Sequence, residues 1–335
     1  MRKELLLLGA FGMLTTATLC AQEFHLQPTP QEYITQKDSV DIPRQYQILS
    51  GNSVQDGPAL PLLRSLMPEE VLGASFRVYI GVKGDKIIKK YQHRIPRKSE
   101  GYFLKIEKDC IVIAGADERG AYYGVQTLAQ LLALDKLPLV EVTDYPDVPY
   151  RGVVEGFYGA PWSQEARIRQ LAFYGRNKMN VYIYGPKDDP YHRTPNWRKP
   201  YPAREGEELK VLVNRAKENN VIFYWAIHPG QDIRWNEEDR SLLLQKFESM
   251  YQLGVRGFAV FFDDISGEGT KADKQAELLN YIDDHFVKVK RDVAPLILCP
   301  TEYNKSWTDV EGGYLTTLGD KLNEGIKVMW TGDMV

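Results

Sequence analysis

The chain has 335 residues, of which 43% are hydrophobic and 26% are charged, and its formal net charge is -3. This balance is typical of a globular protein, and the length is enough for two domains. A slightly negative chain with no Lys/Arg-rich run beside aromatic residues argues against nucleic acid as a partner.

The first 21 residues are typical of a secretory signal peptide. A short basic start is followed by an apolar run and then by the small residues Cys20 and Ala21. We expect cleavage near Ala21 and a secreted or periplasmic protein. A lipid anchor on Cys20 is the alternative, but Leu19 is a poor match to the small residue that such signals prefer. No later segment is apolar enough to span a membrane, so we expect no integral membrane segment after signal removal.

The cysteines and histidines form no disulfide or metal-binding pattern. Only Cys110 and Cys299 remain once the signal peptide is removed, and they fall in different predicted domains. The five histidines show no His-x-x-x-His or similar spacing. We therefore expect neither a metal site nor a cofactor.

Residues 22–147 are predicted to form a separate small α/β domain. Residues 24–33 contain two prolines and are expected to be extended or at a sheet edge. A helix is predicted over 119–134, because its apolar residues recur at spacings of three and four. Alternating or continuous apolar residues predict strands at 76–81, 102–106 and 110–115. Two prolines within 144–149 mark a linker, so the second domain is expected to span 148–335.

From Tyr150 onward, strands and helices alternate strictly. Apolar runs predict six strands, at 151–158, 179–184, 221–227, 257–262, 296–300 and 327–330. Such runs are typical of parallel strands that are buried on both faces by helices. Ser163 is predicted to cap the first helix, and the helix after the fourth strand is expected to run to about Val293.

This alternation fits either a barrel or a doubly wound sheet. Polar residues follow nearly every predicted strand, whereas a doubly wound sheet would concentrate them at one switch point. No G-x-G-x-x-G or P-loop motif is present. We therefore predict a (β/α)8 TIM barrel. The stretch is shorter than the roughly 250 residues of eight units, so we expect about six βα units of an incomplete barrel.

Two adjacent acids, Asp263 and Asp264, follow the fourth predicted strand. Burying carboxylates is costly, and the C-terminal ends of barrel strands are where catalysis occurs. Hydrolysis of a glycosidic bond needs an acid for the leaving oxygen and a second negative group for the cationic sugar. The alternatives are loop acids that cap a helix or pair with lysines, and a Mg²⁺ site with Glu268. The metal motif belongs on a helix, whereas a strand precedes these acids.

Five motifs in order resemble the O-GlcNAcase family, glycoside hydrolase family 84. They are Arg151–Gly159, Tyr184–Pro190, Phe261–Asp264, Pro300–Tyr303 and Trp330–Gly332. The resemblance covers both predicted domains and is close to bacterial members with a signal peptide. It implies retaining hydrolysis of β-linked N-acetylglucosamine, in which the acetamido group of the substrate is the nucleophile and an oxazoline is the intermediate.

The resemblance also implies roles for individual residues. Asp263 would orient and polarise the acetamido nitrogen, and Asp264 would be the general acid and then the general base. Tyr303 would hydrogen-bond the acetamido oxygen. Lys187 and the backbone of Gly156 would hold sugar hydroxyls, and the pocket would also include Tyr158.

Each of the binding residues has a plain structural alternative. Lys187 could be a surface lysine paired with Asp188 or Asp189, and Gly156 could be a bend at a barrel corner. Tyr303 could be part of a buried rim. His228 is expected to be structural rather than a base, because the acid pair already supplies both roles. For the two tryptophans considered as sugar platforms, Trp162 and Trp307, packing is the favoured role.

The resemblance therefore implies an exo-acting β-N-acetylglucosaminidase. Its expected substrates are β-GlcNAc glycoconjugates or O-GlcNAc peptides. The alternatives are an endo-acting glycosaminoglycan hydrolase and a non-catalytic sugar-binding paralogue. The intact pair of acids argues against the paralogue.

Overall fold

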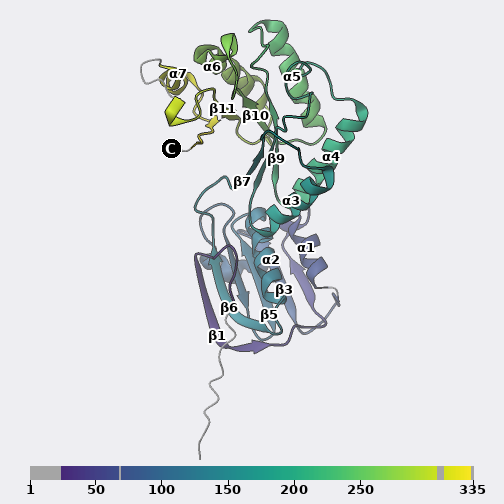
Figure 1. Ribbon diagram of the computed structural model, residues 1–335. Helices are drawn as coiled ribbons and strands as arrows, with labels where there is room; N and C mark the ends of the chain where they lie inside the picture. The colour runs from purple at the N-terminus through teal and green to yellow at the C-terminus, as the bar shows by residue number, and fades with distance from the viewer. Residues whose placement is uncertain (1–23, 68, 308–312, 333–335) are drawn as a thin grey trace, which may run out of the picture.

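The computed structural model of the protein describes residues 24–67, 69–307 and 313–332 (Figure 1). The expected signal peptide, residues 1–21, and the alternative lipid anchor at Cys20 lie outside these residues, so both stay predictions. Among the helices in the described part of the chain, none is both long enough and apolar enough to cross a membrane.

A six-stranded mixed sheet forms the first half of the chain, in the order β1-β6-β4-β5-β3-β2. Its strands are β1 (Glu32–Val40), β2 (Gln47–Ser50), β3 (Arg77–Val82), β4 (Tyr102–Ile106), β5 (Cys110–Gly115) and β6 (Leu137–Asp144). One face is covered by α1 (Ala59–Leu66) and α2 (Glu118–Leu132), and the other by the 3-10 helix η2 (Lys86–Arg94). The three strands and the helix that the sequence predicts here are confirmed.

The second half of the chain forms a curled sheet of six parallel strands, which neighbour one another in chain order. They are β7 (Gly152–Glu155), β8 (Val181–Tyr184), β9 (Ile222–Ile227), β10 (Gly257–Phe261), β11 (Ile297–Cys299) and β12 (Lys327–Val328). The helices of this half are α3 (Gln164–Arg176), α4 (Ala203–Glu218), α5 (Glu237–Gln252), α6 (Ala272–Ile282) and α7 (Tyr314–Lys321). This half-barrel confirms the predicted fold class.

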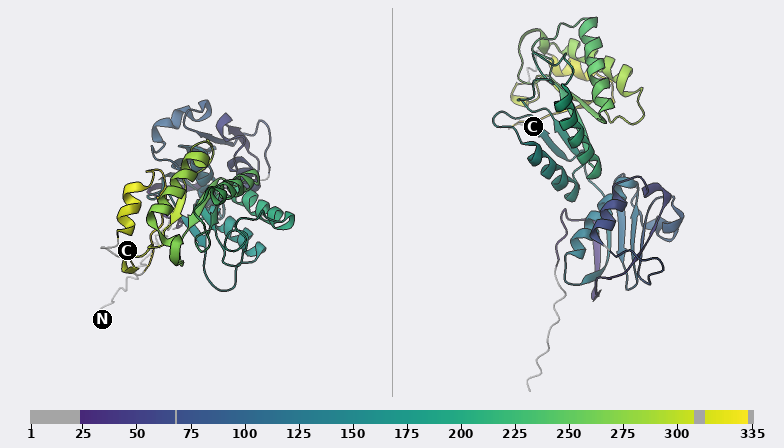
Figure 2. Two further views of the ribbon diagram at one scale, coloured as in Figure 1. Left: turned by 90° about the horizontal axis from the view of Figure 1, so that it is seen from above. Right: turned by 90° about the vertical axis from the view of Figure 1, so that its right-hand side faces the viewer.

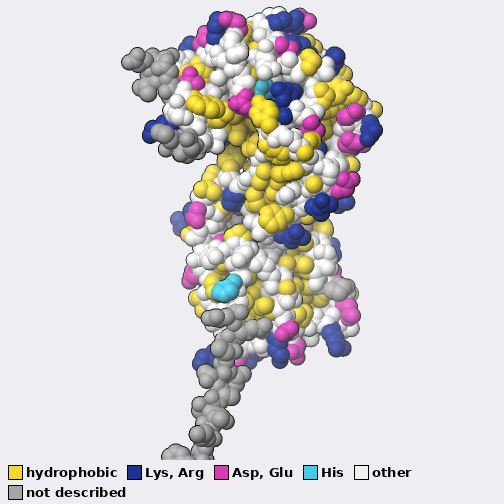
Figure 3. All heavy atoms as spheres, in the orientation of Figure 1, with side chains coloured by type: hydrophobic (Ala, Val, Ile, Leu, Met, Phe, Trp, Pro, Cys, Tyr) yellow, Lys and Arg dark blue, Asp and Glu magenta, His cyan; other side chains and the backbone are white. Residues whose placement is uncertain are grey.

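The alternation of side chains along the strands explains why their sequences are continuously apolar. In β10, Phe258 and Val260 pack against the helices, whereas Ala259 and Phe261 belong to the cluster inside the curl. Phe247 of α5 stacks on Phe258 with ring centroids 4.8 Å apart. Figure 3 shows hydrophobic side chains gathered over the middle of this half, with charged side chains scattered around its rim.

Two elements end earlier than the sequence pattern predicts. The strand expected over 151–158 ends at Glu155, so the residues after it form a loop. The prediction of one long helix to Val293 is wrong. Helix α6 ends at Ile282 and continues only as a π-helical turn, in which Lys288 N donates to the carbonyl of Asp283. The nearby Pro295 also disfavours helix in the residue before it.

Figure 2 shows the two halves of the chain as two lobes joined at one end. Their polar contacts near the N-terminal ends of β7 and β8 are largely buried. Lys178 Nζ lies 2.8 Å from Asp144 Oδ2, and Arg151 Nη2 lies 2.5 Å from Glu100 Oε2. Lys178 and Arg151 both precede their strands. The first domain therefore abuts the end of the half-barrel opposite the C-terminal strand ends. The boundary between residues 147 and 148 itself stays a prediction.

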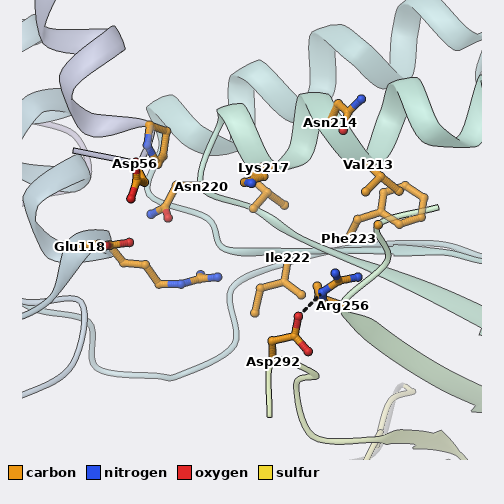
Figure 4. Close-up of a pocket in the computed structure, with 15 residues that line it drawn as sticks. Asp56, Glu118, Val213, Asn214, Lys217, Asn220, Ile222, Phe223, Arg256 and Asp292 are labelled. Carbon is orange, nitrogen blue, oxygen red and sulfur yellow. Dashed lines mark hydrogen bonds and ion pairs between the residues drawn. The ribbon is translucent and has the colours of Figure 1, made fainter. Parts of the chain in front are cut away.

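A cavity of about 520 Å³ also lies between the two halves (Figure 4). Around it lie Glu118 of α2, Lys217 of α4, and the ion pair of Arg256 with Asp292. Ile222, which lines this cavity, is the first residue of β9. The cavity is therefore at the opposite end of the barrel from the paired acids, which follow the last residue of β10.

Candidate active site

Strand β10 delivers Asp263 and Asp264 to the C-terminal edge of the half-barrel. The strand end is tied to β11, because Phe262 N donates to the carbonyl of Cys299 at 2.9 Å, and Thr301 Oγ1 donates to that of Phe262 at 2.9 Å. Asp264 has φ 54°, the left-handed region that few residues other than glycine adopt. This turn breaks the alternation of the strand and lets adjacent carboxylates reach one cluster of side chains.

Asp263 is the more enclosed of the two acids. Its Oδ2 lies 3.1 Å from Lys187 Nζ, and its side chain is 16% exposed. His228 Nε2 lies 2.8 Å from its main-chain oxygen and 3.5 Å from its Oδ1. This Oδ1 atom is buried and accepts no hydrogen bond within the described residues. Asp263 therefore has one oxygen held by a cation and one buried acceptor without a donor.

Asp264 is held by two phenols instead. The hydroxyl of Tyr158 donates to Oδ2 and that of Tyr303 donates to Oδ1, each at 3.1 Å. Burial and the neighbouring Asp264 raise the pKa of Tyr303 well above its ordinary value, so Tyr303 stays a hydroxyl donor at neutral pH. Tyr158 is 67% exposed and lies over Lys187, whose Nζ is 5.1 Å from the ring centroid. Both acids thus share one cluster.

Lys187 points into this cluster rather than along the surface. Its side chain is only 12% exposed and pairs with Asp263, so the alternative of a pair with Asp188 or Asp189 is wrong. Asp189 instead anchors the loop after β8, because its Oδ2 accepts hydrogen bonds from the hydroxyls of Tyr184 at 2.9 Å and Tyr201 at 2.7 Å.

Gly156 follows a buried acid that the sequence analysis did not identify. Glu155 is fully buried and accepts three hydrogen bonds from Arg167, from Nε at 2.9 and 3.1 Å and from Nη2 at 2.7 Å. An added Cβ at Gly156 would make only ordinary contacts, the nearest at 3.5 Å to Val154. The protein packing therefore does not require glycine here, and close approach of a ligand to this backbone stays a prediction.

The two histidines beside the site are buried. Burial lowers the pKa of His228, although Asp263 opposes this effect, and the hydrogen bond to the main-chain oxygen of Asp263 supports a structural role. His192, which the sequence analysis did not identify, is 1% exposed, and burial lowers its pKa to about 3. His192 could have been identified from the sequence because it lies in the loop that follows a predicted strand, six residues after Pro186.

The two tryptophans differ in exposure. Trp162 packs against the barrel core and lies 5.4 Å from the ring of Phe157, centroid to centroid. Trp307 is 53% exposed and contacts the ring of Tyr303 edge-on at 4.7 Å. Packing accounts for Trp162, whereas Trp307 also leaves half of its surface to solvent beside the site.

The geometry gives little support to a metal at the acids. Within the described ranges, no group of three or more His, Cys, Asp or Glu side chains is placed to hold a metal ion. Glu268, the third ligand of the Mg²⁺ alternative, pairs with Lys271 at 2.6 Å. Two adjacent carboxylates, one beside a lysine and one beside two phenols, instead suit acid–base work at a glycosidic bond.

The parallel half-barrel with paired acids at its C-terminal edge fits a glycoside hydrolase, and comparison with known families shows this class. Residues 151–335 match the family model described as beta-N-acetylglucosaminidase, and residues 23–145 match that of glycosyl hydrolase family 20, domain 2. The first match covers more than half of the chain. The chain belongs to the beta-N-acetylglucosaminidase family, the O-GlcNAcase family of glycoside hydrolases (GH84).

Individual relatives support this family. The chain is 38% identical over 193 residues to the protein O-GlcNAcase of Rattus norvegicus, covering 55% of this chain and 21% of that protein. It is 29% identical over 167 residues to the beta-hexosaminidase of Vibrio vulnificus, covering 49% and 19% of the two chains. The chain thus spans about a fifth of the length of these relatives.

Two solved structures share both halves of the fold. The structure of CpGH84B superposes with a TM-score of 0.86 and 37% sequence identity, covering 93% of this chain and 57% of that one. The structure of CpGH84D has a TM-score of 0.84 and 29% identity, covering 93% and 56%. These superpositions include the small α/β domain together with the half-barrel.

Proposed function

We propose that the protein is a retaining exo-β-N-acetylglucosaminidase that removes terminal β-linked GlcNAc, including O-GlcNAc on proteins, by substrate-assisted catalysis. The family of the chain supports the glycosidase class, and a protein O-GlcNAcase and a beta-hexosaminidase are among its relatives. Export from the cytoplasm, through the expected signal peptide, is part of the same proposal.

The observation that carries this proposal is the state of Asp263. A buried carboxylate oxygen without a hydrogen-bond donor is costly. Its Oδ1 atom is in this state within the described part of the chain, while Lys187 compensates the charge at Oδ2. The N–H of a substrate acetamido group is a donor of the kind that Oδ1 needs.

In the first step, the acetamido oxygen attacks the anomeric carbon as the bond to the leaving oxygen breaks. Asp263 accepts a hydrogen bond from the acetamido N–H and stabilises the positive charge that develops in the oxazoline ring. Asp264 gives its proton to the leaving oxygen. Tyr303 has one hydroxyl proton, which it donates to Asp264 at 3.1 Å, so we infer that substrate binding redirects this proton to the acetamido oxygen.

In the second step, the roles reverse. Asp264, now a carboxylate, takes a proton from water, and the water oxygen attacks the anomeric carbon. The bond from that carbon to the oxazoline oxygen breaks, and the acetamido group is restored. Two inversions at one carbon give overall retention, and Asp264 ends protonated as it began.

The proposal is tested with three aryl β-glycosides and the full-length protein. The N-acetylglucosaminide should be hydrolysed. Its rate relative to that of the N-acetylgalactosaminide measures the selectivity for the configuration of the 4-hydroxyl. The glucoside has no acetamido group, so its hydrolysis should be at least about a hundredfold slower, because the intramolecular nucleophile is lost. Similar rates for glucoside and N-acetylglucosaminide would exclude substrate assistance.

A further inference from the structure

Two buried histidines lie behind the acids and join the ends of three neighbouring strands. His228, after β9, places Nε2 at 2.8 Å from the main-chain oxygen of Asp263, after β10. The main-chain N–H of His228 donates to the carbonyl of His192 at 2.7 Å. His192 Nε2 lies 2.8 Å from the carbonyl of Pro186, the residue before Lys187. Hydrogen bonds therefore run from the loop of Lys187 to Asp263.

The hydrogen bonds of His192 and His228 determine the tautomer and the charge of both imidazole rings. Each Nε2 faces a carbonyl oxygen, which can only accept, so each Nε2 carries the proton and donates it. His192 and His228 are 1% and 3% exposed, and burial disfavours their charged forms. Both rings are therefore neutral donors with little freedom to reorient.

The position of His228 also leaves Oδ1 of Asp263 free to accept a hydrogen bond from the substrate. At 3.5 Å, His228 Nε2 is too far from Oδ1 for a good hydrogen bond, whereas its contact with the main-chain oxygen is short. The ring thus holds the backbone of Asp263 without occupying the acceptor that the acetamido N–H would use. A donor on Oδ1 itself would compete with the substrate.

We propose that His228 and His192 are positioning residues that hold Lys187 and Asp263 in the geometry that the acetamido group requires. This inference rests on the proposed function, since it assigns the two histidines to the step in which the oxazoline forms. They touch neither substrate nor the leaving oxygen in this scheme, and they act through the loops that carry the pair. A misplacement of reacting groups by about 1 Å costs roughly a hundredfold in rate.

The test uses two amides that differ by one methylene group. In His228→Gln, the side-chain amide nitrogen can take the place of Nε2, whereas in His228→Asn the amide falls short of the Asp263 carbonyl. We expect kcat/KM of His228→Gln on an aryl β-N-acetylglucosaminide to stay within about tenfold of the parent protein. We expect His228→Asn to lose roughly a hundredfold. Equal losses in two folded variants would overturn the inference.

A double-mutant cycle separates positioning from a general structural defect. If His228 acts through Asp263, His228→Asn should cost little more in an Asp263→Asn background, because coupled residues are not additive. The loss should also be the same for good and poor aryl leaving groups, since proton transfer from Asp264 is untouched. Additive losses, or a loss concentrated on poor leaving groups, would contradict the inference.

His285 supplies the matched control histidine. It lies in the π-helical turn after α6, is exposed, and its Nδ1 contacts the carbonyl of Tyr281 at 2.8 Å. His285→Gln should leave kcat/KM unchanged. The parent protein separates the two proposals: if it fails to hydrolyse the N-acetylglucosaminide, the proposed function is wrong. If it hydrolyses that substrate and His228→Asn does so equally well, only the positioning role is wrong.

Discussion

At the scale of single residues, the two adjacent acids have different surroundings, and this difference decides what each can do. Asp263 contacts a cation and a histidine, and keeps one buried oxygen without a donor within the described residues. Asp264 contacts two phenols, one of them largely exposed. An acid that must exchange protons with a leaving group and with water is better placed at the open side of the pair.

This difference gives a prediction for Asp264. Asp264→Asn removes the proton donor, and proton donation matters most for a leaving group that is a poor anion. We expect roughly a hundredfold or greater loss of kcat/KM on an alkyl or weakly acidic aryl N-acetylglucosaminide, and a much smaller loss on a strongly activated aryl one. A Brønsted plot of rate against leaving-group pKa measures this, and parallel plots for variant and parent would remove the acid assignment.

At the scale of elements, the helix after β7 places the loop that carries Gly156 and Tyr158. The predicted cap is confirmed, because Ser163 Oγ accepts a hydrogen bond from Ala166 N at 3.2 Å. Glu165 adds an acidic side chain in the first turn of α3, where the helix dipole favours it. The helix begins where the sequence places it.

We expect Ser163→Ala to lower the free energy of unfolding by about 1 kcal/mol, because an orphan N–H at the helix start loses its acceptor. Ser163→Asn, which keeps a capping oxygen, should stay within about 0.5 kcal/mol of the parent protein. Urea unfolding followed by circular dichroism measures both. Equal free energies of unfolding for Ser163→Ala and Ser163→Asn would show that the capping hydrogen bond does not stabilise the fold.

Much of the fold and site could be predicted because it depends on local pattern. The apolar runs of β7 to β11 and the acids after β10 are contiguous in sequence. Strand β1 was not predicted, since nearly all its residues are exposed and show no alternation. Glu155 and His192 were missed because their roles depend on partners brought close only by folding, such as Arg167 and the carbonyl of Pro186.

At the scale of the whole molecule, a buried ion pair joins the two halves of the chain. Lys178 and Asp144 have side chains only 8% and 11% exposed, and the hydroxyl of Tyr102 contacts both, at 2.8 and 3.0 Å. Removing one partner of such a pair leaves the other charge buried and uncompensated.

Lys178→Met keeps much of the side-chain volume but leaves Asp144 without its cation. We expect the free energy of unfolding to fall by about 3 kcal/mol, and the added substitution Asp144→Asn to restore part of it. Lys210→Met, at an exposed lysine of α4, is the control and should change stability by less than about 0.5 kcal/mol. A buried-pair variant as stable as this control would show that the contact is unimportant.

The buried histidines make the stability of the whole fold depend on pH. Burial lowers the pKa of His192 to about 3 and also lowers that of His228, while both have values near 6.5 when unfolded. Below about pH 6.5 these two histidines are therefore protonated in the unfolded chain but stay neutral in the folded chain. The free energy of unfolding consequently falls as the pH falls. Each histidine contributes at most about 1.4 kcal/mol per pH unit.

Urea unfolding at pH 7, 6 and 5 measures this slope. The carboxylates contribute equally to parent and variant, so the comparison isolates the histidine. His192→Gln keeps a donor for the carbonyl of Pro186 but cannot titrate, and its stability should fall less steeply over this range. Coincident slopes would mean that His192 is not responsible for the effect.

The left-handed backbone at Asp264 constrains how this site can evolve. Aspartate and asparagine tolerate φ near 54° better than most residues with a side chain, because their short polar groups bond to the local backbone. Most other substitutions add backbone strain to the loss of the carboxylate. A lineage that abandoned catalysis while keeping this fold would therefore reach asparagine at lowest cost, and a lectin-like descendant should carry it at this position.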